Sequence, residues 1–122
     1  MFFSPTDAKN IPEVALYQQW MARVVPDAAL ELYSAYGWGA AKLFVQTLKA
    51  VGPNLTRTAF TAAIRKVHSF DTGGFLTPTD PAGHVPSPCY ALWVIQNGQF
   101  VRQDTPATGF RCDGQFVPYN GS

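Results

Sequence analysis

The sequence predicts an α/β domain, because hydrophobic residues recur with helical spacing through its middle and with strand character near its end. Residues 10–25, 34–51 and 56–67 carry apolar side chains every three or four positions, which is typical of helices with one buried face. Residues 90–95 and 100–102 are rich in β-branched and aromatic residues and flank an Asn-Gly pair, the strongest short-range hairpin signal. The predicted order is a short strand, three helices, further short strands and a C-terminal β-hairpin.

The composition of the 122 residues is that of one small domain with a buried core. Hydrophobic residues make up 47% and aromatic residues 14%, so disorder is not expected. Only 14% of the residues are charged, about half the usual quarter, which indicates that other polypeptide covers much of the surface. Nine Lys and Arg balance eight Asp and Glu, so neither nucleic-acid binding nor polybasic membrane attachment is expected.

The first helix is predicted over residues 10–25, after a buried strand end at residues 1–5. Asn10 is expected to cap this helix, with Pro12 in its first turn and Glu13 completing a capping box. Its end is expected near residue 25, because Pro26 disfavours helical angles in the residue before it. The apolar stripe consists of Val14, Tyr17, Met21 and Val24.

The second helix is predicted over residues 34–51, with Ser34 as its N-cap and Gly52-Pro53 at its end. Glycine is costly inside a helix, so Gly37 and Gly39 are expected to allow another backbone to pack closely. The expected buried face consists of Tyr36, Ala40, Leu43, Phe44, Leu48 and Val51.

A third helix is predicted to begin at Thr56, and the hairpin to turn at Asn97-Gly98. The helix is expected to carry positive charge in its last turn and to bury Phe60, Ala63, Ile64 and Val67. A two-residue turn places Gln96 opposite Gln99. Asp71 and Asp80 flank Gly-rich turns, where their side chains are expected to accept hydrogen bonds from nearby amides.

Three of these segments together resemble a known family. They are Tyr33-Ser34-Ala35-Tyr36-Gly37, Phe70-Asp71-Thr72-Gly73-Gly74-Phe75-Leu76 and Asn97-Gly98-Gln99-Phe100-Val101. In this order and spacing they resemble the C-terminal third of type I periplasmic substrate-binding proteins, in particular the receptors of branched-chain amino acid ABC transporters. Each motif alone is weak, and the resemblance covers nearly the whole chain.

The resemblance implies a partial type I periplasmic-binding-protein fold, taken from a two-lobed receptor. Residues 1–25 then end one lobe, 26–88 form the helical part of the other, and 89–122 form the hairpin and tail. The implied function is that of a solute-binding component that captures a small amino-acid-like or amide-like ligand between the lobes and delivers it to an ABC permease. Neither an enzymatic activity nor a cofactor is implied.

The resemblance also implies a location and an assembly behaviour. The location is periplasmic or extracellular, although Met1–Pro5 lacks the basic region and length of a signal peptide. Because strand edges are left without neighbours in such a segment, self-association is expected.

The resemblance places three candidate ligand-binding residues, Tyr33, Ser34 and Tyr36, where the chain re-enters a lobe and starts a helix. An aromatic ring there suits an apolar ligand side chain, because it buries a large area with few rotatable bonds. The alternatives are that Tyr36 points into the core, that Tyr33 packs in the hinge, and that Ser34 only caps the helix.

The two cysteines, Cys89 and Cys112, flank the hairpin and are expected to form a disulfide. The hairpin register brings Cys89 opposite Pro106, and a fold-back at Gly109 can then bring the sulfurs within bridging distance. In an exported protein such a bridge contributes around 3 kcal/mol through loop entropy. The alternative is two buried free thiols.

Two other function classes remain open. The first is a self-standing structural or protein-interaction domain that buries Tyr33, Trp38 and Trp93 against a partner. The second, much weaker, is a thiol hydrolase using Cys89 and His84, for which no third member is evident. No metal site is expected, because the histidines and cysteines lack ligand spacing.

Overall fold

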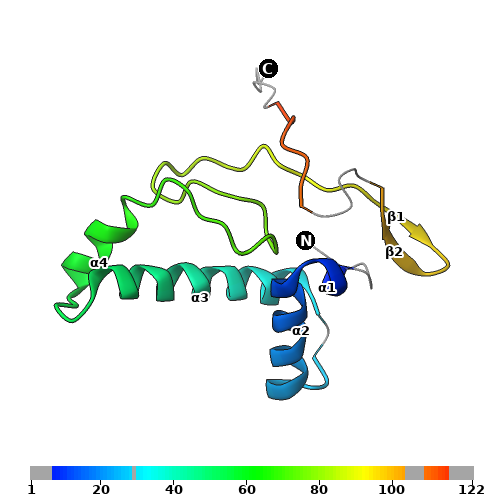
Figure 1. Cartoon of the computed structure of the whole chain (residues 1–122), viewed down its shortest axis with the longest axis horizontal. Coiled ribbons are helices and arrows are strands. Elements are labelled where there is room, and N and C mark those ends of the chain that lie inside the picture. The colour runs from blue at the N-terminus through cyan, green and yellow to red at the C-terminus, as the bar shows by residue number, and fades with distance from the viewer. Residues whose placement is uncertain (1–6, 29, 104–108, 116–122) are drawn as a thin grey trace, which may run out of the picture.

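The computed structural model describes residues 7–28, 30–103 and 109–115. Helices and an antiparallel hairpin coexist, as the sequence predicts, while the expected strand at residues 1–5 lies outside the described residues. The elements are α1 (Asp7–Asn10), α2 (Pro12–Val24), α3 (Leu32–Val51), α4 (Arg57–Ile64), β1 (Trp93–Gln96) and β2 (Gln99–Arg102). In Figure 1, α2 projects from one end of the long α3 and α4 lies at the other end, while residues 65–92 return along α3.

The start of α2 differs from the predicted capping box. Residues 7–10 form the short helix α1, so the N-cap of α2 is Ile11 rather than Asn10, and no side chain caps it. Pro12 occupies the first turn as expected, and the helix ends at Val24, just before Pro26. Val14 and Tyr17 are buried as predicted, but Val24 is 68% exposed because the outer end of α2 extends beyond the core.

The buried face of α3 is not the predicted one. The helix begins at Leu32, and the residues it buries are Ala35, Gly39 and Thr47. Tyr36 and Phe44, which were expected inside, are 57% and 51% exposed. Ala35 and Gly39 face inward because the loop after α4 lies against them: Phe75 is in the same buried cluster as Ala35, and Leu76 approaches Gly39.

The two glycines of α3 show how close this packing is. A Cβ added to Gly39 would lie 2.6 Å from Leu76 Cδ1, whereas one added to Gly37 would meet nothing within 4 Å. Close packing is therefore present at Gly39, although side chains rather than the predicted backbone make it, and the prediction is wrong at Gly37.

The helix α4 begins as predicted, with Thr56 Oγ1 accepting a hydrogen bond from the Ala59 amide at 3.0 Å. It ends at Ile64, so the basic residues that follow lie beyond its last turn. The predicted inward residues are only half-buried, because α4 contacts α3 chiefly through Phe60 and Phe44, with ring centroids 5.0 Å apart.

The core lies where α2, the start of α3 and the 70–76 loop meet. Its central aromatic is Phe75, which is 1% exposed and whose ring centroid lies 4.8 Å from that of Tyr17. The buried cluster consists of Ile11, Val14, Tyr17, Ala35 and Phe75. The Gly-rich motif of the loop thus places the aromatic side chain of Phe75 between α2 and α3.

The hairpin has the predicted two-residue turn and register. Gln96 pairs with Gln99, while Asn97 and Gly98 have φ angles of 51° and 74°, the left-handed values that such a turn requires.

Arg102 connects the hairpin to the N-terminal part of the chain, since its Nε lies 3.7 Å from Oδ1 of the buried Asp7. Its guanidinium also lies over the Trp93 ring, 4.9 Å from the centroid, and Trp93 packs against the core as expected.

The Cys89–Cys112 disulfide predicted from the sequence is present. A fold-back at Gly109, with φ of 83°, and an antiparallel bridge between Tyr90 and Arg111 bring the tail beside residues 89–90. The other described backbone bridges of the returning loop are also isolated pairs, so the further strands expected there do not form.

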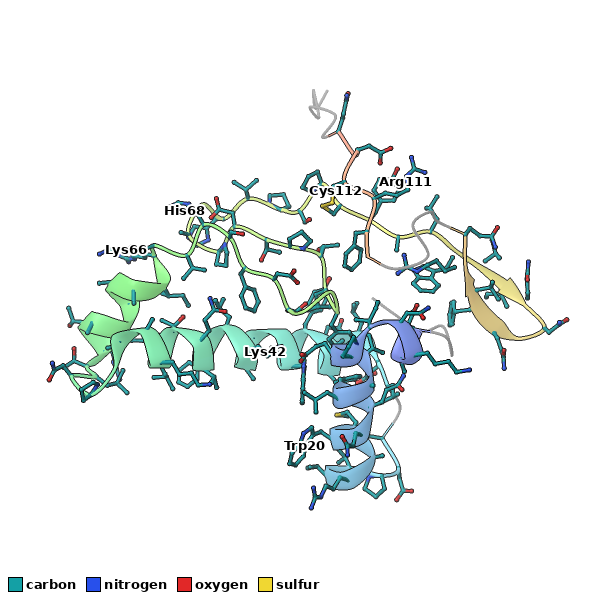
Figure 2. The ribbon with its side chains drawn as sticks, in the orientation of Figure 1. Trp20, Lys42, Lys66, His68, Arg111 and Cys112 are labelled. Atoms are coloured by element: carbon teal, nitrogen blue, oxygen red, sulfur yellow. A yellow bond between two sulfur atoms is a disulfide. The ribbon has the colours of Figure 1, made fainter. Side chains whose placement is uncertain are left out.

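Large apolar side chains are exposed on both α2 and α3. Trp20 is 43% exposed on α2 and points away from the core (Figure 2). Tyr33, at 79%, is the most exposed of these residues. Within the described ranges, no helix combines the length and the apolarity needed to cross a bilayer.

Candidate functional site

The first turn of α3 presents two aromatic side chains to solvent. Tyr33 and Tyr36 are 79% and 57% exposed, and a spacing of three places them as neighbours on one helix face. The alternative in which Tyr36 points into the core is wrong, because Ala35 and Gly39 occupy the inward face instead. The two rings form an aromatic platform at the start of the helix.

Ser34 lies between them in sequence, but its hydroxyl is used within the protein. It donates to the Glu31 carbonyl at 2.8 Å, accepts from the Glu31 amide at 3.3 Å, and bonds the Tyr17 hydroxyl. A hydroxyl has one donor and two acceptor positions, so these contacts account for all of them, with Tyr17 as the donor. Ser34 is the third helical residue rather than the predicted N-cap, which is Glu31.

A cavity of about 470 Å³ adjoins the platform at Tyr36. This volume lies within the range typical of small-molecule sites. Besides Tyr36, three stretches of chain provide its walls: residues 76–79, residues 87–91 and Phe110. The lining residues are Tyr36, Leu76, Thr77, Thr79, Ser87, Cys89, Tyr90, Ala91 and Phe110.

Of these residues, the sequence singled out only Tyr36 as a ligand contact. Thr77, Thr79 and Ser87 lie in a stretch for which the sequence predicts turns and no ligand contact. This stretch is held by isolated bridges and by the disulfide, and Leu76 at its start packs against Gly39 of α3; contacts of this kind leave no periodic signal in the sequence.

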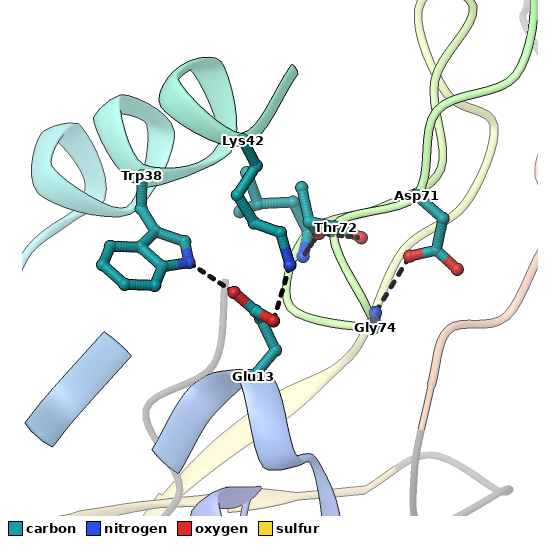
Figure 3. Close-up of polar contacts among 7 residues, drawn as sticks. Glu13, Trp38, Lys42, Asp71, Thr72 and Gly74 are labelled. Atoms are coloured by element: carbon teal, nitrogen blue, oxygen red, sulfur yellow. Dashed lines mark hydrogen bonds and ion pairs between the residues drawn. The ribbon is translucent and has the colours of Figure 1, made fainter. Parts of the chain in front are cut away.

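A polar cluster between α2 and α3 holds the two helices together (Figure 3). The Glu13 carboxylate accepts a hydrogen bond from Trp38 Nε1 at 2.6 Å and pairs with Lys42 Nζ at 2.6 Å. The Glu13 side chain is only 12% exposed, so both partners share a mostly desolvated carboxylate. Glu13 was expected to bond its own helix start, and its actual partners come from a different helix.

The 71–76 loop holds its own shape beside this cluster. Asp71 Oδ1 accepts from the Gly74 amide at 2.9 Å, which confirms the predicted turn role of Asp71. The buried Thr72 hydroxyl accepts from the Leu76 amide at 2.6 Å and donates to the Leu76 carbonyl at 3.3 Å. These bonds set the position of Leu76, which lines the cavity.

Comparison with known proteins identifies a single family. Residues 1–99 match the family model described as periplasmic binding protein, which is most of the 122-residue chain. The chain belongs to the periplasmic binding protein family. No curated protein and no solved structure matches it. The resemblance inferred from the three motifs is thus confirmed at the level of the family.

Membership of the periplasmic binding protein family is consistent with a solute-binding role, and the family is typically non-enzymatic. It implies a ligand and transporter partners in general terms. The Cys89–Cys112 disulfide agrees with an extracytoplasmic location, since such bonds persist in oxidising compartments.

In this periplasmic binding protein, the disulfide also forms part of the cavity wall, because Cys89 lines it. Tyr90 donates to Asp113 Oδ1 at 3.0 Å, and the Arg111 guanidinium pairs with the same carboxylate. Arg111 first, and then the Tyr90 hydroxyl, hold the pKa of Asp113 below its ordinary value of 3.8. Figure 2 shows Arg111 and Cys112 together on this side of the molecule.

The thiol hydrolase alternative is wrong, because the Cys89 sulfur is bonded to Cys112 and cannot act as a nucleophile. Among the described residues, no cluster of potential ligand side chains could hold a metal ion. His68 pairs with Asp80, its Nδ1 3.1 Å from Oδ1. The Gly83 amide, bonded to Asp80 at 2.7 Å, and then His68 hold the pKa of Asp80 below 3.8, which confirms its predicted turn role.

Proposed function

We propose that this chain is the C-terminal segment of the solute-binding component of an ABC importer. It captures a small amino-acid-like ligand, of branched-chain or amide-like type, in a cleft between two lobes and delivers it to a permease. The observation that carries this proposal is the exposed aromatic platform of Tyr33 and Tyr36 beside the 470 Å³ cavity. Tyr36 lines the cavity and Tyr33 lies next to it on the helix, and exposed aromatic rings offer a large contact area at low cost in rotamer entropy.

In this proposal the three candidate residues have different roles. Tyr33 and Tyr36 contact the ligand, because both rings are exposed on one face of α3. Ser34 supports them by fixing the helix start, since its hydroxyl is fully used by Glu31 and Tyr17. Closure of a second lobe over the platform would exclude water from the ligand, as in other hinge-closing proteins.

The test is an NMR titration of the full chain, with ¹³C-labelled tyrosine, against leucine, isoleucine and valine. The ring signals of Tyr33 and Tyr36 are expected to shift with saturation. Tyr33→Ala is expected to weaken binding about tenfold, which corresponds to about 1.4 kcal/mol. The control is Phe44→Ala, an exposed aromatic further along α3, which should leave the affinity unchanged. Tyrosine signals that stay fixed at millimolar ligand would refute the proposal.

A second candidate function is a protein-interaction domain, favoured by the exposed apolar residues of α2 and α3. Of the three residues first considered for it, only Tyr33 is largely exposed; Trp38 and Trp93 pack against the core. The exposed apolar residues concerned are Leu16 and Trp20 on α2 and Phe44 and Val45 on α3, each at least 40% exposed. Self-association measured by light scattering, reduced by Trp20→Ser and Val45→Ser, would support this candidate. A monodisperse monomer would exclude pairing between copies.

A further inference from the structure

We infer that the cavity beside Tyr36 takes an uncharged group that donates and accepts hydrogen bonds and has one apolar side. This inference rests on the proposed function, because it assigns a ligand chemistry to the same site. A carboxamide or an alcohol fits the description, whereas a carboxylate or an ammonium group does not. The reasons are that the cavity wall is uncharged, rich in hydroxyl groups and rigid.

The wall carries no charge among its described residues. An ionised ligand group forms its strongest hydrogen bonds with side chains of opposite charge, and the described residues of this wall offer none. Arg111 contacts a lining residue, since its guanidinium lies 5.4 Å from the Tyr90 ring centroid, but it is already paired with Asp113. A charged ligand group would therefore gain no ionic partner from these wall residues.

The wall is rich in hydroxyl groups that the protein leaves available. Within the described part of the chain, the side-chain hydroxyls of Tyr36, Thr77 and Thr79 have no hydrogen-bond partner. Ser87 Oγ accepts from the Cys89 amide at 3.2 Å, which leaves its proton for donation. Because each hydroxyl both donates and accepts, a ligand group with the same dual capacity can satisfy several of them at once.

The apolar side of the ligand group would lie against Leu76, Ala91 and Phe110, which complete the wall. The wall is held in place before any ligand binds. Thr79 exchanges two backbone hydrogen bonds of 3.0 Å with Phe70, and Cys89 is fixed by its disulfide. Rigid walls reduce the ordering cost of binding, so even a small neutral probe should bind measurably.

Two sources can supply such a group. It can belong to a free neutral molecule, or it can be the uncharged side chain of an amino acid whose charged groups are held outside the cavity. Isobutyramide and isobutyrate test the first source, since they match in shape and differ in charge. Glutamine and glutamate test the second in the same way.

The experiment is a ¹H–¹⁵N titration of the full chain, in which the amide signals of Thr77, Thr79 and Ala91 report on the cavity. Isobutyramide or glutamine is expected to shift them with a Kd at least about tenfold below that of its charged counterpart. Thr77→Val and Thr79→Val keep the side-chain shape and should each weaken binding about fivefold. Thr58→Val, on the exposed part of α4, is the matched control and should change nothing.

The outcomes separate this inference from the proposed function. Equal binding of the charged and neutral partners, or no shift with any probe, would overturn the inference. Leucine-induced shifts at Tyr33, with no cavity shift from isobutyramide or glutamine, would leave the proposed function standing and overturn the inference. If neutral probes shift the cavity signals while no amino acid shifts the tyrosine signals, the inference stands and the proposed function is refuted. The same spectra show whether each variant is folded.

Discussion

The shared carboxylate of Glu13 allows the contributions of a hydrogen bond and an ion pair to be compared within one cluster. Trp38 Nε1 and Lys42 Nζ each lie 2.6 Å from one of its oxygens. The distances are equal, so distance alone does not rank the two interactions. Solvent exposure does, because the Lys42 side chain is 35% exposed, whereas Trp38 packs against the core.

The expected magnitudes follow from this difference. A hydrogen bond to a charged acceptor contributes about 1.5–3 kcal/mol. An ion pair whose cation remains about a third exposed is screened by water and contributes about 0.2–1 kcal/mol. We therefore expect Glu13→Ala to lower the free energy of unfolding by about 2–4 kcal/mol, most of it through the indole N–H left without its acceptor. Lys42→Met should cost less than about 1 kcal/mol.

Urea denaturation followed by far-UV circular dichroism measures these changes, and double-mutant cycles isolate the two couplings. The Glu13–Trp38 coupling, measured with Trp38→Phe, is expected near 2 kcal/mol, and the Glu13–Lys42 coupling near 0.5 kcal/mol. Asp27→Ala removes an exposed carboxylate outside the cluster and serves as the control, within about 0.5 kcal/mol of the parent. A Lys42→Met variant as unstable as Glu13→Ala, or a Glu13–Trp38 coupling below about 0.5 kcal/mol, would refute this ranking.

Three further predictions concern packing, the disulfide and acid stability. Gly37→Ala should stabilise α3 by up to about 1 kcal/mol. Gly39→Ala must displace a core-packed side chain, so it should be less stable than the Gly37→Ala variant by about 1–2 kcal/mol in the same urea assay. Replacing Cys89 and Cys112 by Ala should lower stability by about 3 kcal/mol, and thiol alkylation of the unreduced parent should find neither cysteine reactive. The pKa of Asp113 is lowered on folding, so its contribution to stability is present above pH 3.8 and is lost as the pH falls through the folded-state pKa. Asp113→Asn should flatten that part of an acid-unfolding curve. An unchanged curve would contradict the assignment.

The sequence was most informative where a local rule decides the structure. The Thr56 cap, the end of α2 before Pro26 and the Asn97-Gly98 turn depend on residues within a few positions of each other. Such features follow from backbone geometry and short-range hydrogen bonds, so the residue types alone were sufficient to place them. The disulfide was also predictable, because the hairpin register left few ways to arrange two cysteines.

Sequence reasoning failed where a distant contact decides the structure. Hydrophobic periodicity placed Tyr36 and Phe44 inside α3, but the helix buries its small residues because Leu76 approaches Gly39. Glu13 matched a capping box, yet its partner Trp38 is 25 residues away. Both errors have one cause: an apolar or acidic residue is compatible with several neighbours, and only tertiary packing selects among them.

Leu76 lies between the core and the cavity, so the shape of the cavity depends on how Leu76 packs against α3. Its Cδ1 is the atom nearest to a Cβ added at Gly39, and its side chain also lines the cavity. Its backbone is fixed by the buried Thr72, directly after the core aromatic Phe75. Well-packed interiors transmit displacement rather than absorb it, so a methyl group at Gly39 should push Leu76 toward the cavity. The amide signals of Thr77 and Ala91 should therefore move in Gly39→Ala and stay unchanged in Gly37→Ala, although neither glycine lines the site.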